Sequence, residues 1–156
     1  MRRKDREITD PAKIQEIIDH CTCCRVGFND GGEVYIVPVS FGYEKQGDAY
    51  TLYFHGATAG RKFELAQARP NVGFEMDTNY QLTTADTACN FSARFQSIIG
   101  TGRLSLVEDF HEKAKGLNRV MLRASGKSDW EFTEKMLHSV AIFKLEVTSL
   151  SCKEHE

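Results

Sequence analysis

The twenty residues CRVGFNDGGEVYIVPVSFGY, at positions 24–43, carry the clearest structural signal in the sequence. Every second residue of Cys24–Phe28 is apolar, which is the pattern of a strand with one buried face. The tetrapeptide Asn-Asp-Gly-Gly at 29–32 is typical of a hairpin turn. Val34–Tyr43 is rich in β-branched and aromatic residues and forms the return strand, in which Pro38 requires a sheet edge or an irregularity. The stretch therefore predicts an antiparallel hairpin.

A helix is expected before this hairpin, and strands with short helices are expected after it. Thr9 or Asp10 can cap the helix, and Pro11 suits its first turn. An apolar stripe with helical spacing runs from Ile14 to Cys21. The other predicted strands are Tyr50–His55, Val72–Asp77, Ser92–Leu106 and Val140–Leu150, the other predicted helices are Gly60–Ala68, Asp109–Arg123 and Trp130–Leu137, and Thr78–Asn90 is predicted to be a long loop.

The predicted elements indicate a mainly β fold. About six strands with a few short helices, most strands joined by tight turns, favour an antiparallel barrel flanked by helices. A chain of 156 residues fits one domain with a core large enough to fold without disulfides or metal. We find no internal repeat or linker, so residues 1–156 are treated as a single domain.

Charge and cysteine content exclude several classes of protein. The net charge of −2 argues against a dedicated nucleic-acid binder, which normally carries a strong basic excess. The start Met1–Arg6 is basic, but no apolar run follows it. No secretory signal is therefore expected, and no stretch is long enough to span a membrane. With five cysteines and no export signal, reduced thiols and a cytoplasmic location are expected.

The stretch His55-Gly56-Ala57-Thr58-Ala59-Gly60-Arg61-Lys62 joins a predicted strand end to a predicted helix start. Its small residues let the backbone pass close to a ligand, and the free N–H groups of a helix start favour an anion. Arg61 and Lys62 add two cations in the first turn, where cations are unfavourable for the helix dipole. A bound phosphate would explain them; the alternative is an ordinary solvated first turn.

Four further polar residues are weaker candidates for ligand contacts. His55 could hydrogen-bond a ligand from the strand end, or it could be a partly buried histidine that bonds a backbone carbonyl. Ser40, Ser92 and Ser97 could donate to a phosphate or to a ring carbonyl, but they could equally be ordinary strand or turn serines. The sequence leaves both interpretations open for each residue.

The cluster Cys21-Thr22-Cys23-Cys24 raises the question of a zinc site. A structural zinc site needs a second pair of ligands at a workable spacing, whereas Cys89 and Cys152 stand alone and His20 adjoins the cluster. Cys21 fits the apolar stripe of the predicted helix, and Cys24 fits the apolar face of the predicted strand. Packing therefore explains both cysteines, and no metal is expected. A catalytic cysteine with a histidine stays open. The chain has no P-loop, dinucleotide fingerprint or HExxH motif.

Six short stretches, read in order along the chain, are more specific together than any one alone. They are Met1–Ile8, Cys24–Gly27, Val37–Tyr43, Leu52–Ala57, Gly60–Lys62 and Ser97–Arg103. In these stretches the chain resembles the pyridoxamine-5′-phosphate-oxidase-like flavin-binding split barrels. Among them it looks like the branch that includes the nitroimidazole-resistance (Nim) proteins.

The resemblance implies a six-stranded antiparallel split β-barrel of the FMN-binding type. It also implies a homodimer with FMN in a cleft between the two subunits. In such proteins the strand at Val39-Ser40 and the strand end at His55-Gly56-Ala57 flank the isoalloxazine ring. Arg61 and Lys62 would hold the phosphate, and Arg25 would lie nearby.

Further positions of the resemblance concern the partner subunit and the substrate. The stretch from Ser92 to Ser97 would also approach the flavin, either within the same chain or from the partner subunit. The chain departs from the family pattern at Arg123-Ala124, where a His-Tyr pair is expected, and at Ser151-Cys152-Lys153, where Thr-Gly-Lys is expected. If those positions touch a substrate, this protein's substrate differs or its pocket is more open.

The leading functional hypothesis is an FMN-dependent reductase or oxidase that acts on a small molecule such as a nitro-aromatic compound. The flavin would carry the chemistry, with a nicotinamide cofactor as a possible electron donor. No side chain is an evident acid or base, which suits hydride transfer. The alternatives are a flavin, FAD or haem carrier without turnover, with His55 as the haem ligand, and a true pyridoxamine-phosphate oxidase. FAD stays open as the cofactor.

Overall fold

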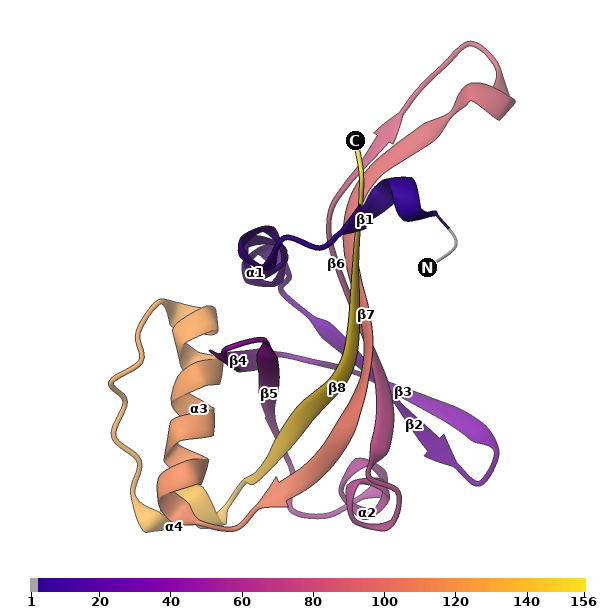
Figure 1. Cartoon of the computed structure of the whole chain (residues 1–156). Coiled ribbons are helices and arrows are strands. Elements are labelled where there is room, and N and C mark those ends of the chain that lie inside the picture. The colour runs from indigo at the N-terminus through magenta and orange to yellow at the C-terminus, as the bar shows by residue number, and fades with distance from the viewer. Residues whose placement is uncertain (1–2) are drawn as a thin grey trace.

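The predicted hairpin forms one edge of a single sheet that contains all the strands of the fold. In this computed structural model, which describes residues 3–156, eight strands form one sheet in the order β3-β2-β6-β7-β8-β5-β4, with β1 paired to β8 (Figure 1). All their ladders are antiparallel, so the prediction of a mainly β, antiparallel fold is confirmed. The strands are β1 (Glu7–Ile8), β2 (Cys24–Asp30), β3 (Glu33–Val39), β4 (Phe41–Gln46), β5 (Ala49–Gly56), β6 (Asn71–Thr83), β7 (Ser92–Val107) and β8 (Ala141–His155).

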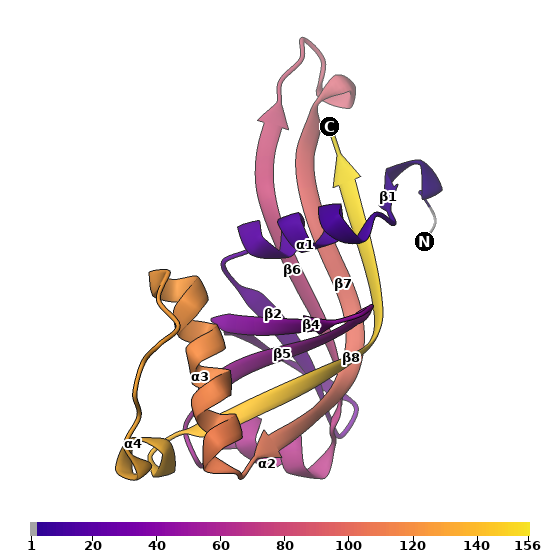
Figure 2. The same cartoon turned by 60° about the vertical axis from the view of Figure 1, so that its left-hand side comes forward.

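The helices flank this sheet, as Figures 1 and 2 show. Helix α3 packs on β4 and β5, α2 lies beside β2 and β7, and α1 lies beside β6 and β7. No helix in the described part of the chain is long and apolar enough to cross a membrane. The helices are α1 (Pro11–His20), α2 (Arg61–Ala68), α3 (Phe110–Ser125) and α4 (Glu134–His138), with 3₁₀ turns at Lys4–Arg6 and Ala88–Asn90.

A single residue connects the two edges of the sheet. Strands β3 and β4 stand at opposite ends of the strand order, yet only Ser40 separates them along the chain. Because one residue cannot span a flat sheet, the sheet must curl until its edges lie side by side. Within the described residues no ladder joins β3 to β4, so the barrel stays split at this seam. The predicted strand Val34–Tyr43 is therefore two strands, which, with β1, raises the strand number from six to eight.

The core forms where the sequence pattern places it. Asp10 caps α1 by accepting a hydrogen bond from the backbone N–H of Ala12, 3.1 Å away. Phe54 of β5 and Phe143 of β8 stack with ring centroids 5.0 Å apart. The buried residues that the two patterns predicted are Ile17, Ile18, Cys21, Cys24, Val26 and Phe28. Both the helix stripe and the strand face are thus confirmed.

Strands β6 and β7 extend beyond the body of the fold as a projecting arm, residues 78–97 (Figures 1 and 2). The predicted loop Thr78–Asn90 is wrong in its first part, because β6 continues to Thr83. A bulge lies between Thr78 and Gln81, and Asn79 within it adopts a positive φ of 55°. A bulge shifts the alternation of side chains by one residue, which hides a strand in a polar sequence.

Two other expectations were wrong in their extent. The predicted helix Trp130–Leu137 shrinks to α4, because Trp130 is held in a loop where its backbone N–H donates to Oδ1 of Asn118 at 2.9 Å. The predicted strand Val140–Leu150 continues to His155, because β8 pairs with the arm of β7 up to that residue.

Candidate functional site

The stretch between β5 and α2 has the geometry of an anion site. Gly60 precedes α2 with φ = 100°, a conformation that favours glycine. No side chain caps this helix start, and the first α-helical hydrogen bond is donated by Glu64 to the carbonyl of Gly60. The earlier backbone N–H groups of α2 are therefore available to a ligand, and the helix dipole favours a negative one.

Lys62 lies beside this helix start, half-buried and without a carboxylate partner in the described residues. Its Nζ is 3.4 Å from the carbonyl oxygen of His55, and it lies 5.0 Å from the ring centroid of Phe143 and 5.8 Å from that of Phe54. Burial lowers the pKa of the Lys62 amine. A half-buried cation of this kind gains by pairing with an anion.

Gly56 was expected to let the backbone pass close to a ligand, but in the structure it makes room for the side chain of Lys62. A Cβ atom at Gly56 would lie 2.7 Å from Nζ of Lys62 and 2.9 Å from its Cε. The lysine side chain thus crosses the space that a larger residue would fill. Gly56 allows Lys62 to fold back against the end of β5, while Ala57 stays exposed on the connection to α2.

Arg61, the other predicted phosphate ligand, points to the β2–β3 hairpin. Its Nε is 2.7 Å and its terminal nitrogen 2.6 Å from Oδ2 of Asp30, and its guanidinium lies 4.3 Å from the ring centroid of Tyr35. This pairing explains a cation in the first turn of α2 without a ligand. Phosphate binding by Arg61 stays a prediction, and the geometry makes Lys62 the better candidate.

Arg25 is not brought to the start of α2 within one chain. It hydrogen-bonds Glu75 at 2.9 Å and Asp77 on β6, and these hydrogen bonds raise the pKa of its guanidinium. Its position on β2 is five residues before Asp30, the partner of Arg61. At about 3.3 Å per residue this spacing is on the order of 15 Å. Two carboxylates thus hold the Arg25 side chain on the sheet surface.

The residues predicted beside the isoalloxazine ring do come together. Phe41 pairs with Phe54 in the β4–β5 ladder, so Ser40 and His55 each follow directly beyond the same pair. Val39 is buried, whereas Ser40 and His55 are exposed. The seam of the barrel and the end of β5 thus form one surface that continues to Gly56 and Lys62.

Ser92 and Ser97 lie on the arm, far from α2 in the same chain. Ser92 pairs with Thr83 near the tip, whereas Asn71, at the α2 end of β6, pairs with Arg103. Eleven residues of β7 separate Ser92 from Arg103, which corresponds to on the order of 30 Å. One chain alone does not join these serines to Lys62, so the predicted contact requires a second copy.

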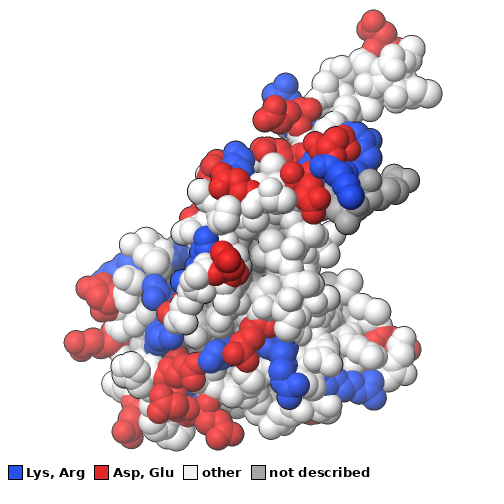
Figure 3. Space-filling model, viewed as in Figure 1, with Lys and Arg blue, Asp and Glu red and all other residues white. Residues whose placement is uncertain are grey.

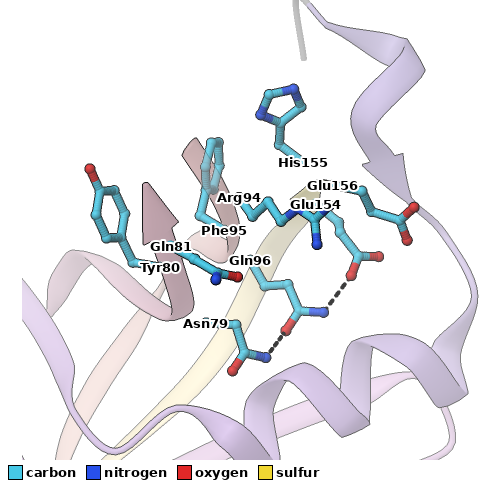
Figure 4. A pocket seen from close by; sticks show the side chains of 9 residues that line it. All are labelled: Asn79, Tyr80, Gln81, Arg94, Phe95, Gln96, Glu154, His155 and Glu156. Carbon is cyan, nitrogen blue, oxygen red and sulfur yellow. Dashed lines mark hydrogen bonds between the residues drawn. The ribbon is translucent and has the colours of Figure 1, made fainter. Parts of the chain in front are cut away.

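The stretch from Ser92 to Ser97 nevertheless borders a polar cleft of about 600 Å³ on the arm (Figure 4). Gln96, only 7% exposed, accepts a hydrogen bond from Nδ2 of Asn79 at 2.7 Å and donates to Oε1 of Glu154. Sequence patterns do not predict this row of polar side chains, because its members lie on three strands that are far apart in the sequence. The one local signal is the polar composition of residues 78–90, which contains Asn79.

Arg123, one of the departures from the family pattern, has a structural explanation. Its guanidinium stacks 4.4 Å from the ring centroid of Phe41 and donates to the carbonyls of Ile18, at 2.8 Å, and Cys21. It also pairs with the carboxylate of Asp19 at 3.1 Å. Arg123 therefore neutralises the carbonyl end of α1 and ties that helix to α3.

The cysteines near α1 pack as predicted. Cys21 and Cys24 are buried, and burial raises the pKa of each thiol to about 12, so both stay protonated at neutral pH. Cys23 is half-buried. Within residues 3–156 no group of three or more His, Cys, Asp or Glu side chains is placed to hold a metal ion. That no metal binds stays a prediction.

A family model described as pyridoxamine 5′-phosphate oxidase matches residues 10–154. The chain belongs to this family. No curated protein matches its sequence. Among solved structures, this member of the pyridoxamine 5′-phosphate oxidase family is similar to a putative 5-nitroimidazole antibiotic resistance protein from Bacteroides thetaiotaomicron. The two are 30% identical with a TM-score of 0.81 over 95% of this chain and 86% of that chain.

Two more distant structures show the same fold. A flavocytochrome from Azotobacter vinelandii is 24% identical, with a TM-score of 0.81 over 100% of this chain and 72% of that chain. An FAD and haem binding protein from Mycobacterium smegmatis is 18% identical, with a TM-score of 0.80 over 97% of this chain and 74% of that chain. The split barrel is thus shared with proteins that differ widely in sequence.

Proposed function

We propose that this chain binds FMN, with the phosphate at the start of α2, and that the flavin reduces a small molecule such as a nitro-aromatic compound. The observation that carries the proposal is Lys62, a half-buried cation without a carboxylate partner in the described residues, beside an uncapped helix start. A phosphate would pair with the amine and accept hydrogen bonds from the backbone N–H groups.

The residues present fit the phosphate of a flavin in charge and in hydrogen-bonding capacity. When bound, the flavin supplies electron transfer to the substrate. The chain's own groups bind and orient it: Lys62 and the α2 N–H groups hold the phosphate, and the exposed surface formed by Ser40 and His55 lies next to them. FAD in place of FMN would use the same phosphate contact.

The similar proteins support both the cofactor class and the substrate class. Two structures with this fold are described as a flavocytochrome and as an FAD and haem binding protein. The 30% identical structure is described as a putative 5-nitroimidazole antibiotic resistance protein, which supports a nitro-aromatic substrate. A nicotinamide cofactor is the proposed electron donor, since the chain needs a source of hydride for repeated reduction.

We also propose that two copies form a homodimer through the open face of the sheet. On this face Val34 and Ile36 of the edge strand β3 are 74% and 61% exposed, and Ile99 of β7 is 59% exposed. Between them Gly27 and Gly73 pair across β2 and β6 and leave the surface flat. The same face carries the Arg25–Glu75 ion pair beside Ile99. Exposed apolar side chains around a flat glycine row, together with a charge pair, are suited to a two-fold contact with its own copy.

The arm offers further surface for the same contact. Its residues Tyr80, Leu82 and Phe91 expose 68%, 52% and 45% of their areas, and few charges lie on the outer arm in the view of Figure 3. A partner's arm is also what can carry Ser92 and Ser97 towards the start of α2.

Sedimentation tests the proposed dimer. We expect the parent protein to sediment as a dimer and Ile36→Lys to shift it towards monomer. A stable flavin-loaded monomer at micromolar concentration would contradict the proposal.

The absorbance spectrum and mass of the small molecule that co-purifies test the cofactor assignment. We expect a flavin spectrum that bleaches on addition of a reduced nicotinamide cofactor and recovers with a nitro-aromatic compound. A flavin that is bound but never bleaches would indicate a carrier, and a haem spectrum would refute the assignment to flavin.

A further inference from the structure

The first residues that the structure describes lie against the end of β8. This N-terminal segment, residues 3–8, contains the 3₁₀ turn Lys4–Arg6 and strand β1, in which Ile8 pairs with Cys152 (Figures 1 and 2). The ladder between β5 and β8 ends at Glu146. Within the described residues, the N-terminal segment is therefore what covers the outer edge of β8 beside the arm.

His155 joins this segment to the arm. Nη2 of Arg6 lies 2.8 Å from Nε2 of His155. Nδ1 of the same ring lies 2.6 Å from the carbonyl oxygen of Ala93 on β7. The ring also packs on Phe95, with the two centroids 5.9 Å apart. One imidazole on β8 thus bridges the N-terminal segment and the arm strand β7.

The two partners of this ring decide which of its nitrogens carries the proton. A guanidinium has only donors, so Arg6 donates and Nε2 of His155 accepts with its lone pair. A carbonyl oxygen only accepts, so Nδ1 carries the hydrogen that it donates to Ala93. Both conditions hold only in the neutral ring that is protonated at Nδ1. The contact therefore requires an uncharged His155.

Protonation of Nε2 breaks the contact with Arg6. The charged ring has two donors and no acceptor, so the hydrogen bond from Arg6 is lost and two cations face each other across 2.8 Å. The hydrogen bond to Ala93 survives, so the loss falls on the N-terminal segment. Histidine is the side chain whose charge changes between about pH 5 and 8, whereas a guanidinium keeps its charge there.

The other charges near His155 include carboxylates that could accept from a protonated ring. Glu7 and Glu156 line the same cleft as His155 and have no ion pair within the described residues. A charged ring gains by turning from Arg6 towards one of them. Nζ of Lys153, 5.1 Å from the ring centroid of Phe95, opposes the charge. The charged residues that line the two clefts beside His155, besides Arg6, are Arg3, Asp5, Glu7, Arg94, Glu154 and Glu156.

We propose that the contact between Arg6 and His155 is a pH-sensitive latch, which holds the N-terminal segment against β8 at neutral pH and releases it in mild acid. Release uncovers the outer edge of β8 and opens the cleft of about 370 Å³ that the segment forms with the end of this strand. The inference does not rest on the flavin proposal, because neither residue belongs to the start of α2.

NMR titration of the whole protein labelled with ¹⁵N tests the proposal. At neutral pH we expect the ring of His155 to be protonated at Nδ1 and unprotonated at Nε2. As the pH falls from about 8 to 5, the ring should become charged. With the same midpoint, the backbone amides of residues 4–8 should lose protection against hydrogen exchange by about tenfold or more, after correction for the intrinsic effect of pH on exchange.

Two variants separate the latch from a general effect of acid. His155→Gln can accept from Arg6 and donate to Ala93 without a change of charge, so the segment should stay protected down to about pH 5. Arg6→Met removes the donor, so the segment should have about tenfold lower protection already at neutral pH. His111→Gln, at an exposed histidine on α3, is the matched control and should keep the transition of the parent.

The state of the ring is measured in the parent protein, so this part of the test does not depend on any variant. The proposal is overturned if the neutral ring of His155 carries its proton at Nε2, or if the protection of residues 4–8 does not change as the ring titrates. It is also overturned if His155→Gln loosens in acid as the parent does, or if Arg6→Met is as well protected as the parent at neutral pH.

Discussion

Replacing Lys62 by Met tests the phosphate assignment most directly. Methionine keeps an unbranched stem against the rings of Phe54 and Phe143 but removes the charge. Hydrogen bonds to charged groups contribute about 1.5–3 kcal/mol each, so FMN affinity should fall roughly tenfold to 150-fold. Riboflavin lacks the phosphate, so its affinity should stay within about twofold. Both affinities can be measured by quenching of flavin fluorescence.

The pH dependence of binding gives the same test without a mutation. Burial lowers the pKa of Lys62 below the ordinary value of 10.5. The amine is charged at neutral pH and loses its proton as the pH rises through this lowered pKa. FMN affinity should therefore be level near neutral pH and fall in alkaline solution at a pH below 10.5. Riboflavin affinity should fall less over the same pH range, because it lacks the phosphate that the amine would bind, and FMN affinity in Lys62→Met should follow the riboflavin curve.

Arg61→Ala serves as the matched control, because Arg61 is paired with Asp30. Its removal should loosen the contact between α2 and the β2–β3 hairpin and affect FMN less than Lys62→Met does. The melting temperature of Lys62→Met should stay within about 3 °C of the parent, because the cost of burying the charge and its attraction to the aromatic rings oppose each other. Equal losses of FMN and riboflavin affinity in Lys62→Met would refute the phosphate assignment.

Three further predictions concern the fold. Gly42→Ala should destabilise the protein by about 1–3 kcal/mol or more, because its Cβ would lie 2.2 Å from the carbonyl carbon of Arg119; an unchanged denaturation midpoint would contradict the packing of α3 on β4. Replacing Cys21 and Cys24 by Ser should lower stability but leave the flavin spectrum unchanged, and stoichiometric zinc in elemental analysis would disprove their purely structural role. Burial alone would raise the pKa of Glu44, but hydrogen bonds from two cations on α3 outweigh it and lower that pKa. Stability from this cluster should therefore persist above the ordinary pKa of 4.5 and disappear as the pH falls below it, and Glu44→Gln should reduce this acid-induced loss in thermal melts.

Sequence alone predicted features that depend on near neighbours along the chain. The hairpin at 24–43, the apolar stripe of α1 and the strand end followed by a helix at His55–Lys62 each follow from local patterns. The phosphate site at the start of α2 is a prediction of the same local kind, since a strand end, small residues and cations are adjacent in the sequence, and it stays a prediction. Local patterns also fixed which faces are buried.

Features set by distant contacts could not be predicted in this way. The partner of Arg61 is Asp30, 31 residues away, so its pairing was invisible and a phosphate was needed to explain the charge. The break at Ser40 was hidden because the strands before and after it have the same composition. The continuation of β6 was hidden because the bulge between Thr78 and Gln81 breaks the alternation of side chains. The extension of β8 to His155 was hidden because its partners there, such as Phe95, lie far away in the sequence.

The one-residue connection between β3 and β4 has a consequence for the order of folding. The hairpins β2–β3 and β4–β5 contain only short-range contacts and can form on the microsecond scale, whereas the β2–β6 and β5–β8 ladders join residues as distant as Thr51 and Glu146. Because Ser40 already holds the two hairpins together, bringing the two edges of the barrel into contact costs almost no loop-closure entropy. A flexible insertion at Ser40 should therefore slow refolding while it leaves every native contact in place. The short connection at this position thus acts on the folding rate of the barrel rather than on the contacts of its native state.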